Sequence, residues 1–132
     1  VEAVEQADLR TLDSLCLDQL HLLKIDVEGM EKAVLDGAAT TIARCRPVIY
    51  VENDRVDRSA ELISTLLGLG YRLFWHAPLL FSPDNFRGVT DNIFGHIWSL
   101  NMLCVPEESD IQVSEMEEVR DANDIARFMT PA

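Results

Sequence analysis

Short apolar runs and amphipathic segments alternate along the chain. The first run, LHLLKID at residues 20–26, is almost continuously apolar, which is typical of strands covered on both faces of a parallel sheet. Three later runs, at residues 47–53, 71–77 and 98–106, are rich in apolar and aromatic residues. The four runs predict four β-strands. Five side chains of the first two strands are expected to be buried: Leu22, Ile25, Val48, Ile49 and Val51.

Helical periodicity fills the segments between the first three strands. Apolar residues recur at every fourth position after the first strand, at Met30, Val34, Ala38 and Ile42. This spacing predicts a single helix that begins near Glu28 and ends before Pro47, because the residue before a proline disfavours helical geometry. A leucine-rich stripe predicts a second helix over residues 57–70. The β-α-β-α-β order is typical of an α/β domain whose helices pack on a mainly parallel sheet.

The remaining residues form a long loop, a last strand and an acidic tail. Residues 78–96 contain two prolines and two glycines and predict a loop, and loops of this length in a domain are usually functional or mobile. The tail after Pro106 is dominated by Asp and Glu. We therefore expect a domain over residues 1–106 and a tail over residues 107–132 that is helical or partly disordered.

The charge and the cysteines narrow the partners and the compartment. The 132 residues carry a formal net charge of −12, so the surface repels the phosphates of nucleic acids and anionic lipids. No apolar stretch approaches the roughly 20 residues that a membrane-spanning helix needs. Cys16, Cys45 and Cys104 are odd in number and far apart, which favours free thiols in a reducing compartment. We expect a cytoplasmic, soluble and globular protein that binds neither nucleic acid nor membrane.

Acidic residues gather where the first two strands end. Asp26 ends the first strand, and Glu52 with Asn53 ends the second. The carboxyl ends of neighbouring parallel strands line the ligand crevice of α/β domains, so these side chains are expected to converge. Simpler roles stay open. Asp26 would cap a helix, and Glu28 and Glu31 would be favourable charges at the helix N-terminus. Glu52 and Asn53 would be turn residues.

The two strand ends carry a recognisable pattern. LLKIDVEGMEKAVLDGA at residues 22–38, followed by RPVIYVEND at 46–54, resembles the C-terminal half of FkbM-type methyltransferases. The family's K-I-D-V-E-G string, a Glu two residues later and the L-x-G-A helix are matched at Lys24–Gly29, Glu31 and Leu35–Ala38. The late N-x-L-x-V-P string at 101–106 also fits, and the resemblance covers roughly residues 9–106.

The resemblance implies both a fold and an activity. The four strands would be the fourth to seventh of a Rossmann-like class I methyltransferase sheet, with the last strand antiparallel between its neighbours. Residues 1–106 would be the C-terminal half of the domain, and the glycine-rich cofactor-binding half would lie outside this sequence. The implied reaction is S-adenosylmethionine-dependent O-methylation of a sugar or natural-product hydroxyl. The chain alone is expected to be inactive and to bind the cofactor weakly, and self-association as a homo-oligomer is one way to cover its exposed edge strand.

The resemblance also implies roles for the acidic residues. Attack by a hydroxyl requires loss of its proton, either to a carboxylate or with help from a divalent cation. Asp26 and Glu28 are therefore the expected catalytic residues, with Asp26 as the base. In the metal alternative, Asp26, Glu52 and Asn53 would bind Mg²⁺. Glu52 stands where Asp is more usual among such enzymes, and this adds one methylene.

Three further residues are candidates for the acceptor side of the site: Glu31, His76 and His96. The two histidines flank the long loop, where a substrate could bind. Two other functions share the architecture. One is a non-catalytic α/β interaction or regulatory module that keeps the methyltransferase fold, and the other is a flavodoxin-like small-molecule-binding domain.

Overall fold

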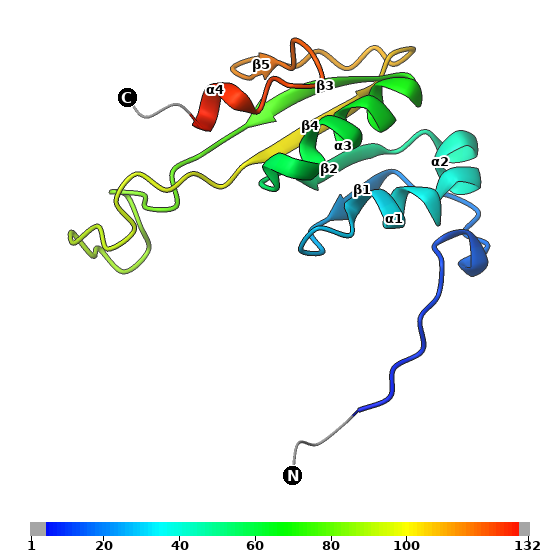
Figure 1. The fold of residues 1–132 in the computed structure, drawn as a ribbon, viewed down its shortest axis with the longest axis horizontal. Coiled ribbons are helices and arrows are strands. Elements are labelled where there is room, and N and C mark those ends of the chain that lie inside the picture. Colours follow the sequence, from blue (N-terminus) through cyan, green and yellow to red (C-terminus); the bar gives the residue numbers. More distant parts are fainter. Residues whose placement is uncertain (1–4, 130–132) are drawn as a thin grey trace.

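The computed structural model describes residues 5–129 and consists of one five-stranded sheet with its main helices on one face (Figure 1). The strands are β1 (Leu22–Ile25), β2 (Val48–Glu52), β3 (Tyr71–His76), β4 (Asn101–Pro106) and β5 (Glu117–Glu118). The helices are the 3-10 turn η1 (Asp13–Leu15), then α1 (Glu31–Asp36), α2 (Ala39–Cys45), α3 (Val56–Gly68) and α4 (Ala126–Met129). The α/β class, the four predicted strands and the second predicted helix are confirmed.

The strand order is β1-β2-β4-β3-β5. β1 and β2 are parallel, whereas β4 runs antiparallel between β2 and β3, as expected for the late strand. β5 adds a second antiparallel strand at the far edge. The prediction of a mainly parallel sheet is wrong, since one of the four strand pairings is parallel and three are antiparallel. The reason is that β2 and β3 point the same way, and the insertion of β4 replaces one parallel pairing with two antiparallel ones.

The single helix expected between β1 and β2 is in fact two. α1 ends at Asp36, and α2 begins at Ala39. The Asp13 carboxylate accepts hydrogen bonds from the backbone N–H groups of Thr40 and Thr41, at 3.0 and 2.8 Å, and so caps the start of α2. A hydrogen bond with the Thr41 side chain, together with these backbone bonds, lowers the Asp13 pKa to about 2. The helix break is therefore set by a residue far away in the sequence.

The core lies between the sheet and helices α1, α2 and α3, on what we call the helix face. Alternate strand residues point to this face, and the fully buried ones include Ile49, Val51, Leu73 and Met102. Ile25 is also buried as predicted, but Leu22 is 61% exposed. The prediction for Leu22 is wrong because β1 is an edge strand and Leu22 points to the opposite face, which no helix covers.

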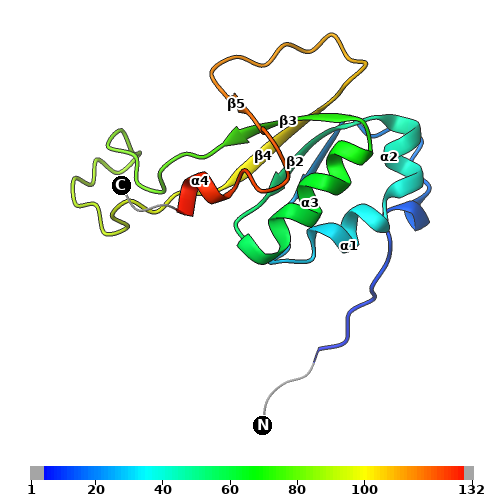
Figure 2. The same cartoon turned by 45° about the horizontal axis from the view of Figure 1, so that its top comes forward.

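That opposite face, the open face, is partly covered by the segment after β4. Residues 107–116 arch over the sheet before the chain returns as β5 (Figure 2). The guanidinium of Arg72 on β3 donates to the backbone oxygen of Ile111 at 2.8 Å, and the neighbouring Phe74 is buried. Val119 and Ile125 then join the core on the helix face. Part of the acidic tail, around Val119 and Ile125, thus packs against the sheet, whereas residues 107–118 stay largely exposed.

Arg46 holds together the end of the sheet where β1, β2 and β3 begin. Its guanidinium donates to the backbone oxygens of Leu69 and Gly70, both at 2.8 Å, and lies 4.6 Å from the ring centroid of Tyr71. It also forms an ion pair of 2.6 Å with Glu108, which follows β4. A single side chain therefore ties the α2–β2 turn to the α3–β3 turn and to the end of β4.

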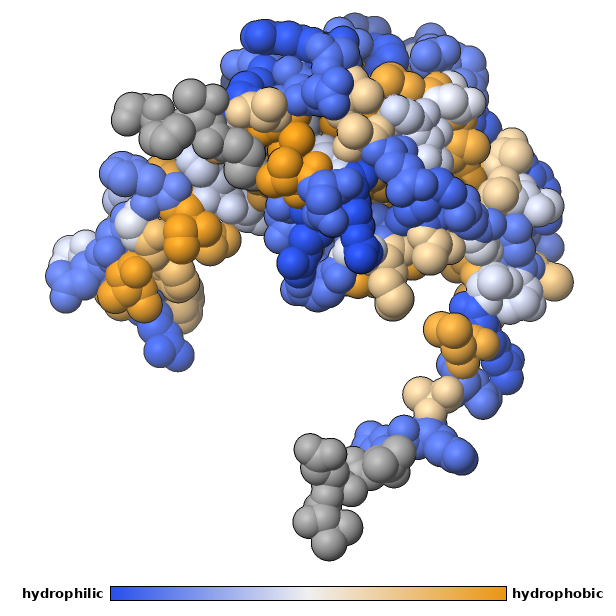
Figure 3. All heavy atoms as spheres, in the orientation of Figure 1, coloured by the Kyte–Doolittle hydropathy of each residue, from blue (hydrophilic) through white to orange (hydrophobic). Residues whose placement is uncertain are grey.

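The long loop between β3 and β4 spans residues 77–100 and extends away from the sheet (Figure 1). One bridge, between Leu79 and Trp98, pairs its two arms. The loop exposes several large apolar side chains, which include Phe86, Ile93, Phe94 and Ile97. In Figure 3, hydrophobic surface, coloured orange, is visible on the projecting lobe. Within residues 5–129, no helix is long and apolar enough to cross a membrane.

Candidate functional site

Polar side chains form a row across the C-terminal end of the sheet, where β1, β2 and β3 end and β4 begins. Glu52 on β2 pairs with Asn101 on β4, and Asn101 pairs in turn with His76 on β3. Asp26 directly follows β1, next to Glu52. The row lies on the open face, because these positions alternate with the buried residues of the helix face. The predicted convergence of Asp26 and Glu52 is therefore present.

The two carboxyl groups of the row share a hydrogen bond. Burial is the largest cause that raises the Glu52 pKa, to about 7, and the negative charges of Asp54 and Asp26 add to it. The hydrogen bond between Glu52 and Asp26 raises the pKa of Glu52 further and lowers that of Asp26. When the pair holds a single proton, that proton therefore resides on Glu52 rather than on Asp26.

Lys24 fixes the ionised state of Asp26. Its ammonium group lies 2.6 Å from Asp26 Oδ2, and this hydrogen bond is the largest cause that lowers the Asp26 pKa. The pair thus consists of one carboxylate with a cation partner and one carboxyl group that titrates near neutrality. A group whose pKa lies near the working pH is the better acid–base catalyst, so Glu52 is the stronger candidate for the base, rather than the expected Asp26.

The turn after β1 explains why so many acidic residues stand there. Glu28 and Gly29 both have positive φ angles, of 53° and 94°, and a Cβ on Gly29 would lie 2.9 Å from an Arg58 nitrogen. Glu31 is only 6% exposed, and its carboxylate accepts the backbone N–H of Gly29 at 2.9 Å. Glu31 therefore holds the turn and the start of α1, and it does not face the polar row.

Glu28 is exposed and lies beside the row. Its carboxylate pairs with Arg55 at 2.5 Å, and its charge contributes to the raised Glu52 pKa. The three acidic residues of this stretch thus have three different settings. Asp26 is in the carboxyl pair, Glu28 forms a surface ion pair and Glu31 is a buried turn residue.

Asn53 does not take part in the row. It is buried, and its side-chain nitrogen points to the sulfur of Met102 at 3.4 Å. Lys24 already occupies the position of a cation beside Asp26. Among the described residues, no group of three or more His, Cys, Asp and Glu side chains could hold a metal ion. The geometry therefore does not support the expected Mg²⁺ site of Asp26, Glu52 and Asn53.

The two histidines differ. The His76 ring nitrogen Nδ1 lies 2.7 Å from the hydroxyl oxygen of Tyr50, which sits two residues before Glu52 on the same face of β2. Burial raises the Tyr50 pKa. His76 is thus part of the row, whereas His96 is exposed in the long loop. Sequence reasoning missed Tyr50; its alternation with Glu52 along the strand was the available signal.

The comparisons with known proteins identify a family for the part of the chain that contains β1 and β2. The model of the methyltransferase FkbM domain matches residues 3–73, more than half of the chain, and this range includes Asp26 and Glu52 but not His76 or the long loop. Neither the curated proteins nor the solved structures contain a significant match. The chain belongs to the FkbM methyltransferase family.

Proposed function

We propose that this methyltransferase domain transfers a methyl group from S-adenosylmethionine to a hydroxyl group, and that the Asp26–Glu52 pair takes up the hydroxyl proton. The observation that carries the proposal is the Glu52 carboxyl group, whose pKa is raised to about 7 beside an ionised Asp26. Such a pair can accept a proton near neutral pH, where an isolated carboxylate of ordinary pKa would be a weaker base.

The chemistry requires a base at this place. S-adenosylmethionine supplies an electrophilic methyl group on a cationic sulfur. A hydroxyl oxygen that forms the new O–C bond must lose its proton as it attacks. Ionised Glu52 accepts that proton, and Asp26, held by Lys24 at 2.6 Å, then accepts the hydrogen bond of the protonated Glu52. The acidic surroundings also favour a cationic methyl donor.

The described residues fit the acceptor side of such a reaction better than the adenosine side. Residues 26–30, between β1 and α1, contain one glycine, Gly29, and residues 53–55, between β2 and α3, contain none. Neither turn has the glycine-rich pattern of a nucleotide loop. We therefore place the cofactor-binding half outside this sequence, in agreement with the family resemblance. β1 would then be an inner strand of a larger sheet.

The other members of the polar row are suited to a hydroxylated acceptor. Tyr50 and His76 place hydrogen-bonding groups near Glu52 on the open face, whereas Asn101 is buried and its amide donates to Ser99. A sugar or a similar natural product presents several hydroxyl groups to such a row. The proposed role of His76 is therefore to orient the acceptor, together with Tyr50.

The test is the pH dependence of methyl transfer by the chain joined to its cofactor-binding half. The rate is expected to rise with pH and to level off above a midpoint near 7, as Glu52 loses its proton. Glu52→Gln should reduce kcat by about 10²- to 10⁴-fold, the usual contribution of a general base. Binding of S-adenosylmethionine, measured by calorimetry, should change little.

The matched control is Asp57→Asn, an exposed acid in the first turn of α3, which should keep the wild-type rate and pH profile. A rate that is independent of pH between 5 and 9, with full activity in Glu52→Gln, would contradict the proposal. Intact cofactor binding without transfer to any hydroxyl acceptor would instead favour a non-catalytic interaction module.

A further inference from the structure

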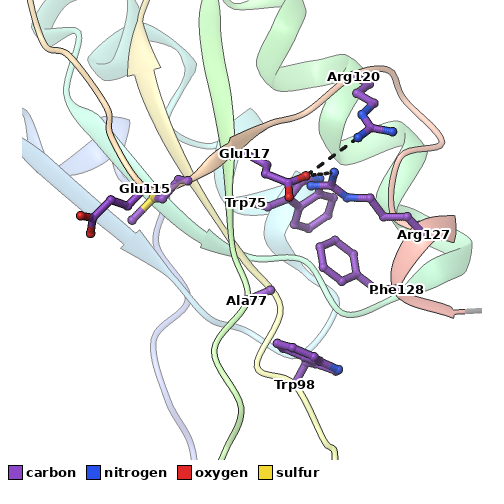
Figure 4. Close-up of a pocket in the computed structure, with 9 residues that line it drawn as sticks. Trp75, Ala77, Trp98, Glu115, Glu117, Arg120, Arg127 and Phe128 are labelled. Carbon is purple, nitrogen blue, oxygen red and sulfur yellow. Dashed lines mark hydrogen bonds and ion pairs between the residues drawn. The ribbon is translucent and has the colours of Figure 1, made fainter. Parts of the chain in front are cut away.

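A hollow lies at the C-terminal end of the sheet, on the helix-face side of β3. Its volume is about 530 Å³, within the range of small-molecule sites. Its walls come from the end of β3, the long loop, residues 115–120 and α4 (Figure 4). The hollow is separate from the polar row, because the row lies on the open face and none of its residues lines the hollow.

Three aromatic side chains line the hollow: Trp75, Trp98 and Phe128. Trp75 is fixed, because its indole N–H donates to the buried carboxylate of Asp124 at 2.9 Å. Phe128 packs against Trp75 edge to face, with ring centroids 5.0 Å apart. Trp98 stands apart from both in Figure 4, and it is 48% exposed. Ala77, between them, carries only a methyl group, which leaves space between Trp98 and Phe128.

The charged groups of the hollow are mostly engaged with one another. Arg127 pairs with Glu117 at 2.5 Å and with Asp124 at 3.7 Å, and it lies over the Phe128 ring at 5.0 Å. Arg120 also faces Glu117, at 4.0 Å. These pairs leave few donors and acceptors for the many hydroxyl groups of a sugar, whereas the Trp98 ring, which is half exposed, stays available for contact.

The charges that line the hollow are balanced. Two arginines, Arg120 and Arg127, stand against two glutamates, Glu115 and Glu117, so the hollow offers no net attraction to a ligand of either charge. Its uncharged part is lined by the aromatic side chains and by the methyl group of Ala77. An aromatic ring gains both burial and stacking there, since offset or edge-on ring pairs are stabilised beyond the area they bury.

We propose that the hollow between Trp98 and Phe128 binds a small ligand through an uncharged aromatic ring. The ring stacks between these two side chains above Ala77, and the Arg127–Glu117 pair closes one end of the site. The site is independent of the carboxyl pair and of the methyl-transfer reaction.

The test uses indole N–H resonances in a ¹H–¹⁵N NMR titration of the 132-residue chain. The chain contains two tryptophans, and both line the hollow, so both indole signals report on it. The main probe is benzyl alcohol. Its comparison probes are cyclohexylmethanol, benzoate, benzyltrimethylammonium and methyl glucoside, which change the aromaticity, the charge or the ring type. Saturable shifts of both indole signals are expected with benzyl alcohol, and binding at least about fivefold weaker with each of the others.

Two variants complete the test. Trp98→Ala should weaken benzyl alcohol binding about fivefold or more, and the Trp75 indole signal, held by Asp124, reports that the fold is intact. Phe86→Ala is the matched control, because Phe86 is a fully exposed aromatic residue of the same loop that does not line the hollow. It should bind as the wild type does. Equal binding in Trp98→Ala, or tighter binding of methyl glucoside or of a charged probe, would overturn the proposal.

Discussion

The two ends of the sheet shift the pKa of a glutamate side chain in opposite directions. At the end where β1 to β3 begin, Glu108 bonds to the guanidinium of Arg46, and this lowers its pKa to about 2. At the end where the same strands stop, Glu52 is partly buried beside Asp54 and Asp26, which raises its pKa to about 7. The sequence alone gives both residues the same formal charge.

The difference separates a structural end from a candidate functional one. Arg46 and Glu108 form an ion pair, and Arg46 joins the α2–β2 turn to the α3–β3 turn and to the end of β4. Their charges therefore favour the folded state. Asp26 and Glu52 bring two acids together, and ionising both disfavours the folded state. Proteins retain such unfavourable clusters mainly where the altered acidity is used, which is why the C-terminal end is the better candidate for catalysis.

The largest effect on stability is expected from removing the clamp at the structural end. Arg46→Ala removes the Arg46 donor from the backbone oxygens of Leu69 and Gly70, of which Gly70 keeps the backbone N–H of Glu107 at 3.0 Å, and it removes the stacking on Tyr71. The free energy of unfolding should fall by about 2–3 kcal/mol, measured by urea denaturation. Arg87→Ala, at an exposed arginine of the long loop, should change it by less than about 0.5 kcal/mol. Equal effects of the two changes would remove the distinction between clamp and surface.

At the C-terminal end of the sheet, loss of the Glu52 charge should raise the free energy of unfolding rather than lower it. Because the folded-state pKa of Glu52 is raised from 4.5 to about 7, folding favours its protonated form. The stability from this proton is full below pH 4.5 and is lost as the pH rises through 7. Glu52→Gln should therefore stabilise the protein at pH 8 by on the order of 1 kcal/mol, after allowance for solvent screening, and leave it nearly unchanged at pH 4.

The same denaturation series at the two pH values gives the measurement, with Glu118→Gln, at an exposed glutamate of β5, as the control. The control should show no gain that appears only at pH 8. A Glu52→Gln variant that is less stable than the wild type at pH 8 would mean that its carboxylate is paired rather than crowded.

The smallest expected effect is a shift of the Glu52 pKa when Asp26 loses its charge. Asp26→Asn removes one negative neighbour of Glu52, so the Glu52 pKa should fall from about 7 toward its ordinary value. The fall should be partial, because burial and the charge of Asp54 remain. A ¹³C NMR titration of the Glu52 side-chain carboxyl carbon measures it. An unchanged midpoint would show that the two carboxyl groups do not interact.

The parts of the fold that the sequence predicts depend on local patterns. The strands, α3 and the meeting of Asp26 with Glu52 follow from apolar runs, helical spacing and the rule that neighbouring parallel strands end together. The helix break at Gly37 could not be predicted in this way, because the cap on α2 comes from Asp13 on another segment. Long-range contacts of this kind leave no periodicity in the sequence.

The missed parts of the site have the same cause. Tyr50 and His76 meet because β4 inserts between their strands and pairs with both in one particular register. Neither the strand order nor this register can be read from apolar runs. The aromatic hollow requires the acidic tail to fold back so that Phe128 reaches Trp75, and the charge of the tail suggested a solvated segment instead. The orientation of Asn53 toward Met102 likewise depends on a packed neighbour from β4.

The reversed direction of β4 has a consequence for how such a domain can diversify. Because β4 runs opposite to β3, the connection between them, residues 77–100, both leaves and rejoins the sheet at its C-terminal end. Insertions, deletions and substitutions can therefore accumulate in this one segment, next to the candidate catalytic groups, while the strand pairings and the core stay as they are. If the proposed acceptor binds at this end of the sheet, changes in the length and composition of this one loop can alter which acceptor fits, while the fold stays the same.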